Sequence, residues 1–82
     1  MEIFMGSIIQ WPMDRAPEGW KLCDGQLLPI IQYQELYSLI GNKYGGDGRT
    51  NFALPDLRGR SANPATAMNY IICINGSYPG RP

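Results

Sequence analysis

The 82-residue sequence contains no histidine, only two cysteines, and equal numbers of basic and acidic side chains, seven of each. Without histidine, neither a Ser-His-Asp nor a Cys-His catalytic arrangement can form, and histidine-based metal sites are excluded. Balanced charge provides neither a polycation for nucleic acid nor an acidic tail. No apolar run reaches the roughly 18 residues of a membrane-spanning helix. We therefore expect no catalysis, cofactor, metal, nucleic-acid partner or membrane insertion.

The chain is short enough to be one domain over residues 1–82, and a domain of this size buries a limited share of its surface. Its core is therefore marginal by itself, which favours association with other copies. The first residues, MEIFM, lack the basic segment and following apolar segment of a classical signal peptide. Conventional export is not expected.

Two strands are predicted in the first third of the chain. Residues 2–11 are largely apolar and predict a strand in which Gly6 is a bulge or a point of close backbone approach. Residues 20–22 predict a short strand, and the Asp-Gly pair at 24–25 is typical of tight hairpins. We expect this turn to lead directly into a paired strand at 26–28.

The apolar period changes over residues 32–40, where side chains spaced three and four apart share one face of a helix. These side chains are Tyr33, Leu36, Tyr37 and Ile40. Gly41 is well placed to end the helix, and Ile31 before it offers no side-chain cap. We expect this helix to depend mainly on packing.

Glycine, proline and polar residues dominate positions 41–66, which predict a long ordered loop rather than a simple connector. A last strand is predicted over residues 68–74, followed by an extended, exposed tail at 77–82. The expected fold class is α+β: a small, mostly-β domain with one short helix at about 32–40 and a long ordered glycine-rich loop.

The Gly-Gly-Asp-Gly run at 45–48 lacks the Gly-Lys-Ser/Thr ending of a phosphate-binding loop and the acidic ligands of an EF-hand. We interpret it as a turn in which Asp47 caps nearby backbone amides.

Asp56, Arg58 and Arg60 alternate along the chain, so an extended backbone places them on one face. We interpret both arginines as clamps on loop carbonyls. The alternative is that Tyr44, Asp47 and these three residues contact a ligand with phosphate or sialic-type carboxylate groups.

Aromatic side chains are numerous for so small a chain, and they predict either a core or subunit interface or, alternatively, sugar stacking. They include Trp11, Trp20, Tyr33, Tyr37, Tyr44, Tyr70 and Tyr78. Cys23 and Cys73 form a disulfide if the first and last strands lie side by side. We favour two small, buried, apolar thiols instead.

Four blocks of sequence, in order and at consistent spacing, resemble the phage tail collar domain family, which includes the bacterial microcystin-dependent proteins. They are GSI at 6–8, APEGWKLCDGQ at 16–26, YGGDG with FALPDLRGR between 44 and 60, and MNYIICINGSYP at 68–79. Longer members carry a variable stretch between the last two blocks, where receptor recognition is expected. Here only residues 61–67 stand between them.

The resemblance implies a non-enzymatic structural subunit of a phage tail, a tail fibre or a related extracellular fibre. Such a subunit belongs on a virion or on an extracellular or cell-surface appendage. Its expected partner is itself, with other tail proteins or cell-surface glycans as further partners. The alternative function is a small receptor- or glycan-binding adhesin that uses residues 44–60.

We expect self-assembly at a sheet edge left open by the strands at the two ends of the chain, since a neighbour can extend such an edge by strand addition. An open head-to-tail contact gives a helical fibre. Closure around a threefold axis gives a homotrimer, as the resemblance implies. The candidate interface residues are Ile3, Phe4, Met5, Ile8, Trp11, Tyr70, Ile72 and Tyr78.

Overall fold

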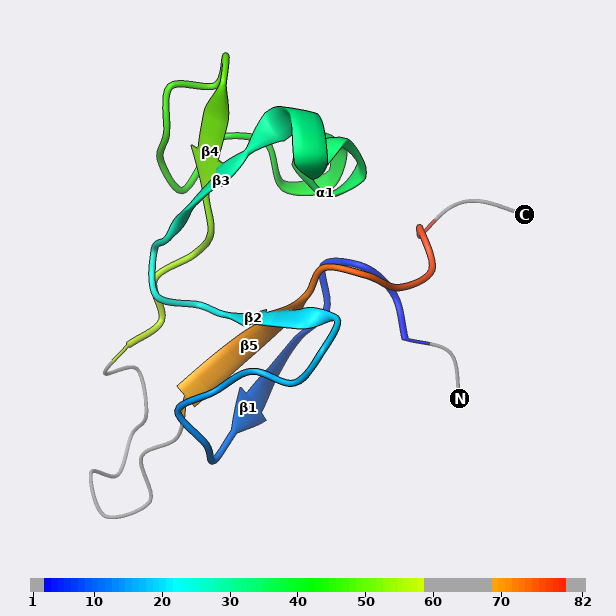
Figure 1. Ribbon diagram of the computed structural model, residues 1–82, viewed down its shortest axis with the longest axis vertical. Coiled ribbons are helices and arrows are strands. Elements are labelled where there is room, and N and C mark those ends of the chain that lie inside the picture. Colours follow the sequence, from blue (N-terminus) through cyan, green and yellow to red (C-terminus); the bar gives the residue numbers. More distant parts are fainter. Residues whose placement is uncertain (1–2, 59–68, 80–82) are drawn as a thin grey trace.

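The computed structural model describes residues 3–58 and 69–79, arranged as two small sheets and one helix (Figure 1). The elements are β1 (Ile8–Trp11), β2 (Trp20–Leu22), β3 (Leu27–Pro29), a 3-10 turn η1 (Ile30–Gln32), α1 (Gln34–Ile40), β4 (Asn51–Ala53) and β5 (Asn69–Cys73). This is the small, mostly-β arrangement with one short helix that the sequence predicts.

The strand nearest the end of the described chain lies in the middle of the larger sheet, whose order is β1-β5-β2. Both neighbours of β5 are antiparallel to it, with Ile72 opposite Ile8 on one side and opposite Lys21 on the other. The expected hairpin from β2 into β3 is therefore wrong. The Asp-Gly turn instead carries the chain out of this sheet, because β3 pairs with β4 in a separate two-stranded sheet.

The predicted first strand is shorter than expected because a turn and a bulge interrupt it at Gly6. The Ser7 N–H donates to the Phe4 carbonyl at 3.1 Å, closing a turn in which Gly6 has φ +89°. The Gly6 N–H donates to the Cys73 carbonyl, and the Cys73 N–H donates to the Ser7 carbonyl, both at 2.9 Å. Gly6 and Ser7 thus both lie opposite Cys73, and this arrangement is a G1 bulge. The predicted bulge at Gly6 is confirmed.

The helix packs against the smaller sheet, as its apolar period predicts. Leu36 is buried, and the rings of Tyr37 and Phe52 lie 5.3 Å apart at 56°. The helix has no side-chain cap at its start. It ends where the Gly41 N–H donates to the Tyr37 carbonyl at 2.7 Å, with Gly41 at φ +61°.

The core draws on both sheets and on the helix. Its buried members are Met5, Cys23, Leu28, Leu36, Phe52, Leu54 and Ile72. Ile71 is also fully buried, so adjacent residues of β5 are covered on both faces of the sheet. This part of β5 is therefore paired along both edges and covered on both faces.

Two segments differ from the sequence expectation. Strand β4 lies within residues 41–66, so this stretch is not loop throughout, and residues 59–66 lie outside the described ones. The start of the expected exposed tail is instead half-buried: the Met5 N–H donates to the Ser77 carbonyl at 2.8 Å, and the Tyr78 and Ser38 hydroxyls lie 2.6 Å apart. Backbone pairing with residues 3–5 holds this tail, and no local sequence signal reports such a contact.

Replacing Leu36 with alanine is expected to lower the free energy of unfolding by about 2–5 kcal/mol, because it leaves a cavity where the helix meets the core. The matched control is Ile31→Ala, a substitution at a neighbouring side chain that is 80% exposed and should change stability little. Urea unfolding followed by circular dichroism measures both. If both substitutions change the free energy of unfolding by the same small amount, the helix does not pack on this core.

Candidate functional site

The loop between α1 and β4 is organised by the carboxylate of Asp47. Its Oδ1 accepts the N–H groups of Arg49, Thr50 and Asn51 at 2.8, 2.9 and 3.1 Å, and its Oδ2 accepts the Thr50 hydroxyl at 2.9 Å. These bonds, led by the one from the Arg49 backbone, hold the pKa of Asp47 well below its usual range. The capping expected of Asp47 is present, and it uses the oxygens that a metal or ligand would otherwise contact.

Gly46 lets the backbone of this loop lie directly against β4. A Cβ at Gly46 would lie 2.5 Å from the Phe52 Cα, and its φ of +88° disfavours any other residue. The glycine is therefore explained by close backbone packing, without a phosphate.

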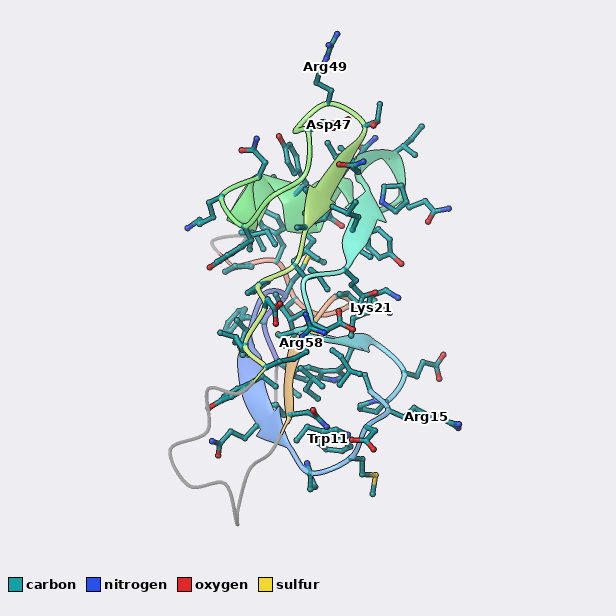
Figure 2. All side chains as sticks on the ribbon, turned by 90° about the vertical axis from the view of Figure 1, so that its left-hand side faces the viewer. Trp11, Arg15, Lys21, Asp47, Arg49 and Arg58 are labelled. Atoms are coloured by element: carbon teal, nitrogen blue, oxygen red, sulfur yellow. The ribbon has the colours of Figure 1, made fainter. Side chains whose placement is uncertain are left out.

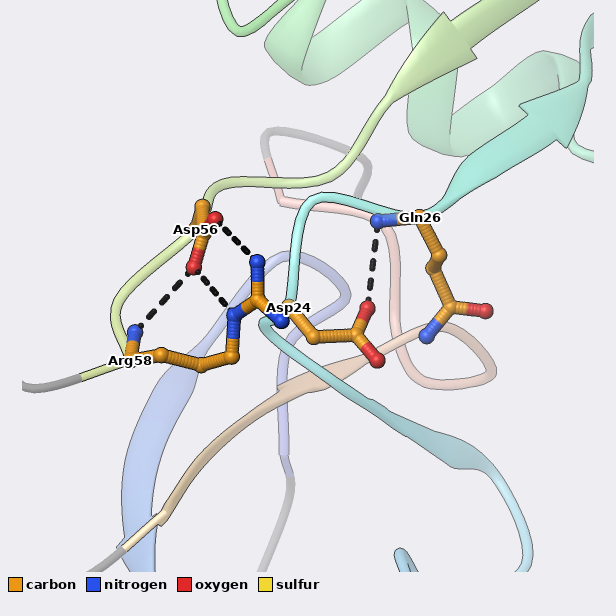
Figure 3. Close-up of polar contacts among 4 residues, drawn as sticks. All are labelled: Asp24, Gln26, Asp56 and Arg58. Carbon is orange, nitrogen blue, oxygen red and sulfur yellow. Dashed lines mark hydrogen bonds and ion pairs between the residues drawn. The ribbon is translucent and has the colours of Figure 1, made fainter.

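Arg58 forms a two-bond pair with Asp56, as Figure 3 shows. Its Nε donates to Oδ1 at 2.9 Å and its Nη2 to Oδ2 at 2.7 Å, while the Arg58 backbone N–H also donates to Oδ1 at 3.2 Å. The pair raises the pKa of Arg58. The guanidinium thus binds a carboxylate two residues away rather than serving chiefly as a clamp on loop carbonyls. Arg60 lies outside the described residues.

A small hollow of about 180 Å³ lies beside Arg58. Its polar lining includes the carboxylates of Asp14 and Asp24. Asp24 also accepts the Gln26 N–H at 3.1 Å, in the turn drawn in Figure 3. With two carboxylates and an already paired arginine, this hollow is unfavourable for the phosphate or sialic-type ligand considered from the sequence.

The candidate ligand residues do not converge on one site. Figure 2 shows Asp47 and Arg49 at one end of the molecule, well separated from Arg58. Tyr44 is exposed, with the Lys43 Nζ 5.8 Å from its ring centroid. The loop region therefore presents two separate polar clusters, each satisfied by its own hydrogen bonds.

The two cysteines are free and buried. Continuing the β2–β5 register by one step puts Cys23 opposite Tyr70, three residues from Cys73, which is about 10 Å along the strand and on the other face. A disulfide cannot span that separation. Burial, together with the nearby charge of Asp24, raises the pKa of Cys23 to about 11. The buried-thiol interpretation is confirmed and the disulfide is wrong.

The candidate interface residues fall into three groups by exposure. Ile3, Phe4 and Ile8 are exposed, at 46%, 45% and 41%. Trp11, Tyr70 and Tyr78 are half-buried, with the Tyr70 hydroxyl accepting from Gln10 Nε2 at 3.2 Å. Met5 and Ile72 are core residues, which corrects the predicted set, since a buried side chain cannot contact a neighbour.

Sequence reasoning missed one interface candidate, Ile9, which is 43% exposed. It lies on β1 beside Ile8, and adjacent strand residues point to opposite faces. Neither face of β1 is therefore fully covered at this point, and the strand order β1-β5-β2 places β1 at the sheet edge.

Among the described residues, no group of three or more Cys, Asp or Glu side chains is placed to hold a metal. Over the same part of the chain, no helix is long and apolar enough to cross a membrane.

Comparison with known proteins identifies a family and a relative. The family model of the Phage Tail Collar Domain matches residues 6–62. Protein RhiB of Rhizobium leguminosarum bv. viciae is 44% identical over 45 residues, which are 51% of this chain and 20% of RhiB. The chain thus spans about a fifth of the length of the curated relative that it matches.

Thiol titration should separate free from bonded cysteines. We expect two reactive thiols per chain in denaturant and almost none in the folded protein, because both are buried and a thiol with a raised pKa is largely protonated at neutral pH. The measurement is reaction with Ellman's reagent with and without guanidinium. Finding no thiol in denaturant would contradict the described geometry.

Replacing Asp47 with alanine should lower the melting temperature by several degrees at pH 7. The carboxyl pKa is lower in the folded state than its usual 3.8, so the stabilisation is present above that value and is lost as the pH falls further. The difference between wild type and Asp47→Ala should therefore shrink as the pH falls from about 5 to about 2. Glu18→Ala, another exposed carboxylate change, is the control; an equal effect from it would contradict the capping role.

Proposed function

Because the chain belongs to the phage tail collar domain family, a family of structural tail-fibre domains, we propose that it is a non-enzymatic structural subunit of a phage tail, tail fibre or related extracellular fibre. In this proposal it acts by associating with copies of itself, on a virion or on an extracellular or cell-surface appendage. The family match over residues 6–62 is the observation that carries the structural role.

Self-association is supported by apolar side chains left on the surface near the start of the chain. Ile3, Phe4, Ile8 and Ile9 are each more than two-fifths exposed. Four large apolar side chains within seven residues form a surface that a partner subunit can cover. The small core adds to this argument, since a short domain gains stability from burying surface against another copy.

The polar side chains of the loops favour a structural role over a catalytic one. Asp47, Asp56 and Arg58 hold the loops through bonds within their own segments. The Cys23 thiol is buried and its pKa is raised, which makes it a poor nucleophile.

An adhesin function is the second candidate, and the exposed end of the domain favours it. Tyr44 with Lys43 beside it, and Arg49 at the tip in Figure 2, offer an aromatic face and positive charge. Such groups stack on sugars and pair with carboxylates. Binding on a glycan array that is lost in Tyr44→Ala but kept in Met13→Ala would establish this function.

The proposed assembly predicts a solution mass well above the 9.2 kDa of one chain. Light scattering across a range of concentrations, with electron microscopy of the same samples, measures this. Apolar contacts and backbone pairing resist salt, so we expect the mass to persist at 1 M NaCl, where ionic contacts are screened. Discrete trimers or filaments would fit the forms expected from the resemblance, whereas a monomer at every concentration would contradict self-association.

A further inference from the structure

The two edges of the larger sheet differ in how their backbone groups are satisfied. On one side of β5, the Cys73 N–H donates to the Ser7 carbonyl at 2.9 Å. On the other side, the Cys23 N–H donates to the Tyr70 carbonyl at 2.8 Å and the Ile74 N–H to the Gly19 carbonyl at 2.9 Å. Backbone groups in antiparallel pairs alternate in direction. Odd-numbered residues of β5 therefore bond to β1 and even-numbered ones to β2.

This alternation fixes which groups face away from the sheet. On β1, Ile9 and Trp11 bond to β5, so the N–H and C=O groups of Ile8 and Gln10 point outward. On β2, Lys21 bonds to β5, so the groups of Trp20 and Leu22 point outward.

The outer edge of β2 is partly closed by its own chain, through one outward group of Trp20 and one of Leu22. The Trp20 N–H donates to the Pro17 carbonyl at 3.1 Å, and the Leu22 carbonyl accepts from Gln26 Nε2 at 3.0 Å. Lys21 adds a charge to this strand, a common protection against edge pairing. A neighbouring strand would have to displace these bonds.

The outer edge of β1 has no such protection. Within residues 3–58 and 69–79, the outward N–H and C=O groups of Ile8 and Gln10 have no hydrogen-bond partner. The strand carries no charged side chain, and Ile8 and Ile9 expose apolar surface on its two faces. An unprotected apolar edge is a template for another strand.

We propose that β1 pairs antiparallel with β1 of a second copy of this chain, joining two three-stranded sheets into one of six strands. The inference rests on the proposed self-association and assigns it a surface. A second copy is the occupant because the edge is self-complementary: it offers donors and acceptors in equal number, and pairing it with itself brings no like charges together.

In one register of the two β1 strands, the outward N–H and C=O groups of Ile8 and Gln10 all form hydrogen bonds. With Ile8 opposite Gln10 of the partner subunit, and Gln10 opposite the partner's Ile8, four backbone hydrogen bonds form around a twofold axis. Ile9 then faces the partner's Ile9 across that axis. A shift by two residues would instead place Ile8 opposite the partner's Pro12, which has no N–H to donate.

The symmetry of this contact has a consequence for assembly. A twofold contact closes on itself and joins subunits in pairs. A trimer or helical fibre would need a second surface in addition to β1. Since four residues form a short strand, we expect the association to depend on concentration.

Gln10→Pro tests the backbone contact. Proline removes an outward N–H and no bond to β5, and edge strands tolerate it at such positions. Loss of two intersubunit hydrogen bonds, one per copy, should weaken association by roughly thirtyfold. Gln10→Ala is the matched control, because it also removes the side-chain bond to Tyr70 but keeps the N–H. Light scattering measures mass, and circular dichroism confirms that both variants fold.

Ile9→Cys tests the register. Residues facing each other at such a position have Cα atoms about 4.5 Å apart, within the range of a disulfide. Mild oxidation should yield a covalent dimer, whereas Met13→Cys, 61% exposed before mutation and four residues away, should not. The natural cysteines are buried and should not contribute.

The outcomes separate the two proposals. β1 pairing is supported if Gln10→Pro weakens association while Gln10→Ala does not, and if Ile9→Cys forms a covalent dimer while Met13→Cys does not. Self-association that is equally strong in Gln10→Pro and Gln10→Ala, or that leaves Ile9→Cys uncross-linked, overturns β1 pairing and leaves the proposed self-association standing. A wild-type monomer at all concentrations, with no cross-linking, overturns both.

Discussion

Insertion of β5 between β1 and β2 is the interaction on which the rest of the structure depends. It brings together Ile8 and Ile72, which are far apart in the sequence, and three residues of β5, Ile71 to Cys73, are buried. The same strand brings the following residues back to the start of the chain, where Ser77 pairs with residues 3–5. Without β5, the first two strands have no partner in this sheet and Met5 loses part of its cover. The fold therefore closes only when its two ends meet, which is a costly step for loop-closure entropy.

Features set by neighbouring residues could be predicted from the sequence. The helix follows from the spacing of Leu36 and its neighbours, its end from Gly41, and the bulge from a glycine within an apolar run. Asp47 was expected to cap its own loop because short carboxylate side chains reach amides two to four residues away. Each of these features depends on contacts between residues a few positions apart, and the local sequence pattern predicts such contacts.

Features set by distant pairing could not be predicted in the same way. An Asp-Gly pair is typical of a hairpin, yet β2 pairs with β5, a strand far along the chain that no local pattern indicates. For the same reason, Ile72 and Met5 were wrongly predicted to lie at an interface. In a strand of four or five residues, the apolar pattern does not distinguish an edge strand from a central one. It also left out Ile9, whose exposure depends on β1 having one neighbour rather than two.

The distribution of satisfied and unsatisfied groups supports an assembly role over a ligand-binding one. A binding site needs polar groups that are held in place and still available. Here the carboxylates of Asp47 and Asp56 and the guanidinium of Arg58 are already engaged within their own segments. On β1, all the outward backbone amides and carbonyls lack a partner among the described residues, and isoleucines flank them. Backbone groups of this kind recognise another strand rather than a small polar molecule. The exposed edge of β1 therefore fits the proposed protein partner better than it fits a small polar ligand.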